Sequence, residues 1–114
     1  MDTTNRLTHY RDIIEKILMT YTTIPYAYGH IDIRPSFDRT RDQYLVVNVG
    51  WDGERRVHGC LIHVEINNGK VWIERDGTED GIANALVAAG IPKEHIVLGF
   101  RPAEMRAYTE FAVT

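Results

Sequence analysis

The stretch Tyr44-Leu-Val-Val-Asn-Val-Gly-Trp51 is followed by the turn Asp52-Gly53 and by Val57-His-Gly-Cys-Leu-Ile-His-Val-Glu-Ile66. A second turn, Asn67-Asn68-Gly69, leads into Val71-Trp-Ile-Glu-Arg75. Runs rich in β-branched and aromatic residues that are joined by Asp-Gly and Asn-Gly turns are typical of consecutive β-hairpins. This stretch therefore predicts an antiparallel meander.

The two faces of the meander differ in composition, because successive side chains of a strand point to opposite faces. One face is expected to be covered by helices, and it would carry Leu45, Val47, Val49, Trp51, Cys60, Ile62, Val64, Ile66, Val71 and Ile73. The other face would carry four apolar residues among polar ones, namely Tyr44, Val46, Leu61 and Trp72. A solvated face would be more uniformly polar, so this second face is also expected to be covered.

Two helices are predicted, one on each side of the meander in the sequence. From Thr4 to Tyr21, apolar residues recur every three or four positions, which predicts an amphipathic helix that covers the sheet. Pro25 ends this pattern, because proline cannot continue a helix. The same spacing returns from Thr78 to Ala89, before Gly90 and Pro92, and predicts the second helix.

The remaining segments complete an α+β fold. A first strand is predicted from Ile31 to Phe37, and Pro35 marks it as an edge strand or a bulge. Ile96 to Phe100 is expected to be a short strand or an extended segment, and Pro102 to Tyr108 suits a last helical turn. We therefore expect a single domain over residues 1–114, with an N-terminal helix, a four-stranded antiparallel sheet of order 1-2-3-4, a second helix and an irregular C-terminal arm.

Charge and hydropathy argue against nucleic acid and membranes as direct partners. The formal net charge is -3, which gives no global attraction to phosphates or anionic lipid. Arg39 and Arg41 would be separated from Arg55 and Arg56 by a strand of about nine residues, roughly 30 Å, so the arginines form no single basic stripe. The longest apolar run, 86–91, is far shorter than the ~20 residues that cross a bilayer. We expect a cytoplasmic protein.

Candidate catalytic and metal-binding residues have simpler structural interpretations. The segment Asp76-Gly-Thr78-Glu-Asp80-Gly81 resembles the start of a calcium loop, but Val87 stands where a bidentate carboxylate is needed. Asp76 and Thr78 are therefore interpreted as a candidate helix cap. The single cysteine, Cys60, is expected to be a buried thiol, and no zinc-type spacing is present. The sequence predicts no catalytic residue, metal or cofactor; the alternative is a small hydrolase or nuclease-like enzyme that uses the Asp76–Asp80 loop with His58.

The second sheet face supplies the candidate interaction surface. Tyr44, Val46, Leu61 and Trp72 would form one apolar patch, which two helices on the opposite face cannot cover. We expect a homodimer or higher oligomer, or a partner chain, to bury this patch with Trp72 as an anchor. The C-terminal arm, Phe100 to Phe111, is the alternative cover.

Four sequence blocks together resemble one family. They are Asn48-Val-Gly-Trp-Asp52, Arg56-Val-His-Gly-Cys-Leu-Ile-His63, Asp76-Gly-Thr-Glu-Asp-Gly-Ile82, and Gly90-Ile-Pro-Lys93 with Ile96-Val-Leu-Gly-Phe100. This combination closely resembles the XisI family, the cyanobacterial fdxN-element excision controlling factors, from about Tyr10 to Val113. The resemblance implies a small α+β accessory protein that, with an XisH-like companion, controls developmentally timed excision of a DNA element during heterocyst differentiation. It assigns no active-site role to any residue.

Overall fold

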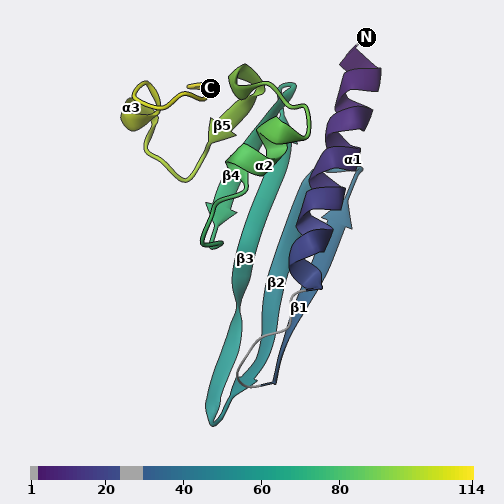
Figure 1. Ribbon diagram of the computed structural model, residues 1–114, viewed down its shortest axis with the longest axis vertical. Helices are drawn as coiled ribbons and strands as arrows, with labels where there is room; N and C mark the ends of the chain where they lie inside the picture. The colour runs from purple at the N-terminus through teal and green to yellow at the C-terminus, as the bar shows by residue number, and fades with distance from the viewer. Residues whose placement is uncertain (1–2, 24–29) are drawn as a thin grey trace.

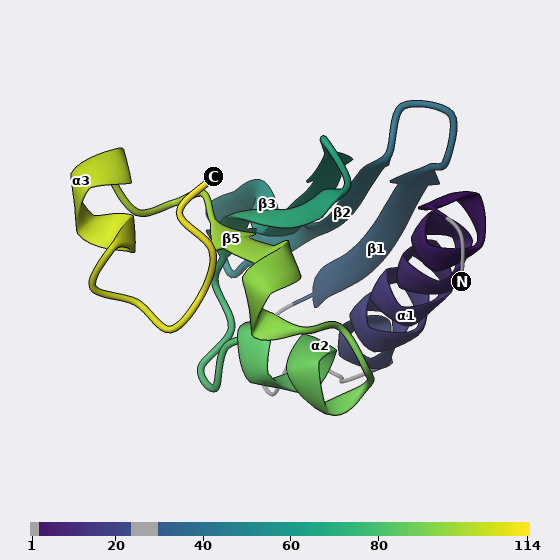
Figure 2. The same cartoon turned by 90° about the horizontal axis from the view of Figure 1, so that it is seen from above.

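The computed structural model describes residues 3–23 and 30–114. In chain order the elements are α1 (Thr3–Thr22), β1 (His30–Asp38), β2 (Gln43–Asp52), β3 (Arg55–Asn67), β4 (Lys70–Asp76), α2 (Ala83–Ala88), the 3-10 helix η1 (Lys93–His95), β5 (Ile96–Leu98) and α3 (Ala103–Arg106). Helices α1 and α2 pack on one side of the sheet, and the C-terminal segment with α3 lies beyond β5 (Figures 1 and 2).

The sheet has five strands in the order β1-β2-β3-β4-β5. The first four are antiparallel neighbours, which confirms the predicted meander and its order. The fifth, β5, pairs in parallel with β4, because the chain crosses over through α2 before it returns to the sheet. The predicted extended segment at Ile96 is thus a short strand that enlarges the sheet on one edge.

Both hairpin turns form where the glycines predict them. Asn67 pairs with Lys70, and the two residues between them, Asn68 and Gly69, have φ values of 53° and 77°. Two positive φ values in succession are typical of a type I′ turn, whose twist matches that of the strands. At the other turn, Gly53 has a φ of 63°. The turns therefore fix the two ends of β3.

The core lies between the sheet and the helices α1 and α2. The apolar stripe predicted along α1 is confirmed, since it contributes the buried residues Tyr10, Ile13, Ile14 and Leu18. The sheet contributes Tyr44, Val46, Ile62, Val64, Val71 and Ile73, and the segment after β4 contributes Ile82, Leu86, Ile91 and Ile96. The helix break predicted at Pro25 lies outside the described residues.

The predicted assignment of β2 to the covered face is wrong. Tyr44 and Val46 point into the core, so the alternating residues Leu45, Val47, Val49 and Trp51 point to the opposite face. The cause is a β-bulge: Val46 pairs with Ile62 but Val47 pairs with Cys60, so Leu61 is an extra residue in β3. One extra residue exchanges the faces of everything beyond it. If the pairing that begins at Asp52 and Arg55 had continued without the bulge, Leu45 would have paired with Ile62 and shared its face.

Within residues 3–23 and 30–114, no helix has the length and hydropathy needed to cross a bilayer.

Candidate functional site

The four residues predicted to form an interaction surface do not lie together. Tyr44 and Val46 are 0% exposed and belong to the core, where the Tyr44 ring meets that of Phe37 with centroids 5.9 Å apart. Leu61, the bulge residue, packs partly buried against the same core. Only Trp72 lies on the opposite face, where it pairs with Glu65. The predicted patch is therefore not an open surface of the chain.

Trp72 is contacted by the C-terminal arm. The Arg106 guanidinium lies over its ring, 5.2 Å from the centroid. The arm is held beside the sheet because the Ala112 N–H donates to the Ile96 carbonyl at 2.8 Å, next to an isolated bridge between Ala112 and Val97. The arm, which was the alternative cover, thus shields this part of the face.

The residues left open on the sheet are Leu45, Val47, Val49 and Trp51, which we call the open face. The first three are half-buried and Trp51 is 50% exposed. Among the described helices, α1 and α2 lie on the other side of the sheet and α3 lies at its β5 end, where its Arg106 reaches Trp72, so none of them covers this row (Figure 2). Sequence reasoning missed this surface because it placed the row under the helices. A tryptophan directly before a hairpin turn was the available indication that the row ends in solvent.

The far end of β2 and β3 projects beyond the rest of the sheet, and we call residues 47–60 the arm hairpin (Figure 1). A hollow of about 340 Å³ lies along it, lined by residues 55–61 of β3 together with Asn48, Arg75 and Gly77. Cys60 lies here and donates its S–H to the Ile62 carbonyl at 3.2 Å. Burial raises the pKa of the Cys60 thiol, and nearby Arg75 opposes that rise only in part. A raised pKa disfavours the thiolate that a nucleophilic cysteine needs.

Asp76 and Thr78 organise a loop instead of capping a helix at its first turn. Asp76 Oδ1 accepts hydrogen bonds from the Thr78 N–H (3.0 Å) and hydroxyl (2.5 Å), and Oδ2 accepts one from the Ile82 N–H (2.8 Å). The Thr78 hydroxyl oxygen accepts the Gly81 N–H at 3.1 Å. These bonds hold residues 76–82 in a loop, so α2 begins at Ala83 and not at Thr78. The N-cap residue Ile82 receives its support through its own N–H.

The acidic loop and His58 are not assembled into a catalytic group. Among the described residues, no hydrogen bond or ion pair joins His58 to Asp76, Glu79 or Asp80. Within residues 3–23 and 30–114, no cluster of three or more His, Cys, Asp or Glu side chains is arranged to hold a metal ion. Both oxygens of the Asp76 carboxylate already accept hydrogen bonds from residues of its own loop.

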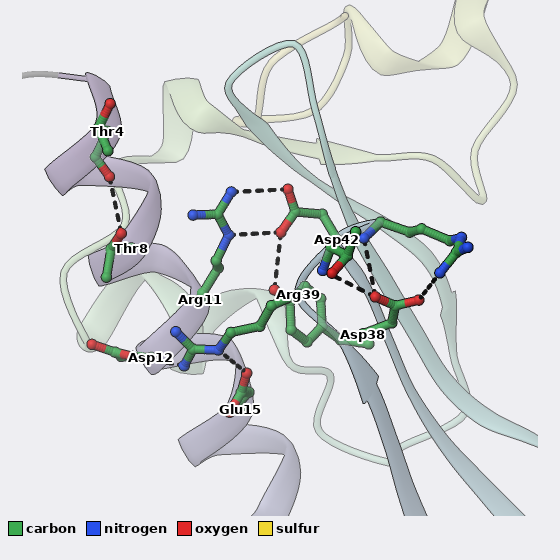
Figure 3. Close-up of polar contacts among 11 residues, drawn as sticks. Thr4, Thr8, Arg11, Asp12, Glu15, Asp38, Arg39 and Asp42 are labelled. Carbon is green, nitrogen blue, oxygen red and sulfur yellow. Dashed lines mark hydrogen bonds and ion pairs between the residues drawn. The ribbon is translucent and has the colours of Figure 1, made fainter.

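At the opposite end of β2, ion pairs join the β1–β2 turn to α1, and we call this the clamped end (Figure 3). Arg11 donates two hydrogen bonds to Asp42, from Nε at 2.7 Å and from Nη2 at 3.1 Å. Arg39 donates to Glu15 at 2.6 Å and to Asp12 at 2.7 Å. Arg11 thus extends from α1 to the turn, and Arg39 extends from the turn to α1.

Asp42 is the centre of the clamped end. Besides Arg11, its Oδ1 accepts the hydroxyl of the buried Tyr44 at 3.0 Å. The hydrogen bonds from Arg11 lower the pKa of the Asp42 carboxyl, although burial opposes them. Burial raises the pKa of Tyr44, and its hydrogen bond to Asp42 adds to the rise. Asp42 is thus ionised and Tyr44 neutral at physiological pH.

Comparisons with known proteins agree over almost the whole chain. The family model of the XisI protein matches residues 1–113. The crystal structure of a XisI-like protein from Anabaena variabilis has 33% sequence identity and a TM-score of 0.88, covering 95% of this chain and 99% of that one. The crystal structure of the fdxN element excision controlling factor XisI from the same organism has 40% identity and a TM-score of 0.83, covering 96% and 99%. No curated protein matches the sequence. The chain therefore belongs to the XisI family.

Proposed function

We propose that this chain is a non-enzymatic regulatory protein that controls the excision of a DNA element together with an XisH-like partner. The observation that carries the proposal is the 40% identity, over 96% of the chain, to a protein described as an excision controlling factor. A likeness that spans helices, sheet and C-terminal arm favours a shared role over a shared fold alone. The regulatory character is the part that the family supports most directly.

Contact with a protein is favoured over contact with DNA. The net charge of -3 gives no general attraction to phosphates. The open face presents a row of apolar residues that ends at the half-exposed Trp51. Aromatic residues are enriched in protein interfaces, where they bury a large area at little cost in conformational entropy. We propose that a second chain covers this face, in a homodimer or higher oligomer or in the complex with the XisH-like protein.

Co-purification with the XisH-like protein tests this proposal. Trp51→Glu should leave the chain folded by circular dichroism, because the side chain lies outside the core, and should abolish co-purification or lower the sedimenting mass. Tyr108→Glu is the matched control, since Tyr108 is an aromatic residue that is 85% exposed on the C-terminal arm. The control should behave as the wild type.

A deletion strain completes the test. Excision measured by amplification across the new DNA junction, in filaments undergoing heterocyst differentiation, should fail without this gene and return with the wild-type copy. Unchanged excision in the deletion strain would contradict the proposal.

A further inference from the structure

One edge of β3 is open from Arg55 to Cys60. β4 pairs with β3 only along residues 62–67, and the chain turns away after the Gly77 N–H donates to the Leu61 carbonyl at 2.7 Å. The bonds made by Asp76 to its own loop hold the chain in this new direction. In the part of the chain that the structure describes, no other strand pairs with this edge. Free N–H and C=O groups on an edge strand can accept a further strand.

The hollow beside the open edge is positively charged. Arg55, Arg56 and Arg75 line it, and no acidic residue is among its described lining residues. Arg55 reaches Asp52 only at 3.5 Å, with side chains that are 73% and 48% exposed. The Arg56 guanidinium lies over the Trp51 ring and donates to the Gly50 carbonyl at 3.3 Å, and the Arg75 side chain makes no hydrogen bond or ion pair within the described residues. This edge is therefore positively charged, whereas the net charge of the whole chain is -3.

We propose that the open edge of β3 binds an extended acidic polypeptide segment, which adds to the sheet as a strand in line with β4. This inference rests on the proposed function, because it names the chemistry of the partner segment that the arm hairpin would receive. Backbone pairing with β3 would supply affinity, and carboxylates on alternate residues, which share one face of the added strand, would reach Arg56 and Arg75.

Two other occupants match the edge less well. Nucleic acid phosphates accept hydrogen bonds but donate none, so the C=O groups of the edge would remain without partners. A second copy that paired through the same edge would bring two sets of three arginines together, and like charges on paired strands are destabilising. An acidic peptide supplies backbone donors and acceptors as well as opposite charge.

Titration of the purified chain with three synthetic ten-residue peptides tests the inference. The first alternates threonine with glutamate, the second has lysine in place of glutamate, and the third is the glutamate peptide with alternate backbone amides methylated. We expect the glutamate peptide to bind and the other two to bind at least tenfold more weakly. Amide hydrogen exchange should slow along residues 56–60 and stay unchanged along 62–67, which β4 already pairs.

A pair of double variants separates charge from general effects. Arg56→Ala with Arg75→Ala, two exposed arginines on one face of the sheet, should weaken binding of the glutamate peptide about tenfold, as expected for two exposed ion pairs. Arg34→Ala with Arg41→Ala is the matched control, because these arginines are exposed elsewhere, in β1 and in the β1–β2 turn. The control should bind like the wild type.

Several results would overturn the inference. No binding of the glutamate peptide, or equal binding of the lysine or methylated peptide, would mean that the arginines only protect the edge from pairing. Tighter binding of single-stranded DNA with the same arginine dependence would assign the edge to nucleic acid. A change in sedimenting mass of the arginine variants alone would assign it to a second copy.

The proposed function can fail separately. If the XisH-like protein co-purifies with the chain but the glutamate peptide does not bind, only the inference on the edge is wrong. If the peptide binds but the deletion strain excises normally, only the proposed function is wrong.

Discussion

The clamped end and the arm hairpin are two ends of the same strands, yet they are built differently. At the clamped end, α1 covers Tyr44 and Val46, and Arg11 and Arg39 tie the turn to the helix. On the arm hairpin, Val49 and Trp51 face solvent, and β3 has a free edge. The clamped end, which α1 covers on one face, should therefore contribute most of the stability. The arm hairpin contributes less and is available for binding.

The largest expected effect comes from two identical substitutions three positions apart in β2. Val46→Ala should lower the free energy of unfolding by about 2–3 kcal/mol, because it removes two buried methyl groups and leaves a cavity. Val49→Ala should cost less than about 1 kcal/mol, since Val49 lies on the open face. Urea unfolding of both variants checks this. Equal losses in the free energy of unfolding would contradict the difference between the two ends. A larger loss for Val49→Ala would mean that the bulge at Leu61 is misplaced.

An intermediate effect is expected from Asp42→Asn at the clamped end. Asparagine tolerates the φ of 53° at this position, so the substitution removes the charge without adding backbone strain. We expect a loss of about 1–2 kcal/mol, because the Arg11 pair is partly exposed and partly screened. Asp52→Asn is the matched control, as Asp52 forms only an exposed pair on the arm hairpin. It should change stability by less than about 0.5 kcal/mol.

The pH dependence of Asp42→Asn sharpens the same point. The pKa of Asp42 is lower in the folded chain than in the unfolded one, chiefly because Arg11 donates to the carboxylate. Its contribution is therefore fully present above the unfolded value, about 4, and disappears as the pH falls through the folded value. The stability difference between wild type and variant should be constant near neutral pH and shrink below about pH 4. A difference that stays constant down to pH 2 would show that the charge is not responsible.

The smallest effect is expected in the Asp76 loop, which lies between the two ends. Asp76→Ala or Thr78→Ala should each cost about 1 kcal/mol, a value typical of side chains that bond the backbone before a helix. Asp80→Ala, whose carboxylate is exposed, should cost less than about 0.5 kcal/mol. Thermal unfolding measures all three. Calorimetric titration that showed tight divalent-metal binding, lost in Asp80→Ala, would instead revive the enzyme alternative.

The sequence predicted the strands, their order and the first helix, because these depend on local patterns. Asn68 and Gly69 specify their turn through backbone preference alone, and the spacing from Leu7 to Tyr21 specifies one helix face. The candidate surface was misplaced for a different reason. Leu61 is an ordinary strand residue by type, and only pairing with β2 shows that it is the extra one. The start of α2 was misplaced because Asp76 and Thr78 bond to a loop, and an N-cap and a loop use the same residue types.

The bulge at Leu61 also limits how the chain can change in length. Between this residue and the Gly53–Glu54 turn, the two strands of the arm hairpin pair without interruption. Insertion of two residues into each strand would lengthen the arm hairpin by about 7 Å and keep every side chain on its present face. A single inserted residue in β3 would either turn the outer residues over or require a second bulge. The arm hairpin can therefore change its length without turning side chains over only in steps of two residues per strand, while the core on the other side of Leu61 keeps its register.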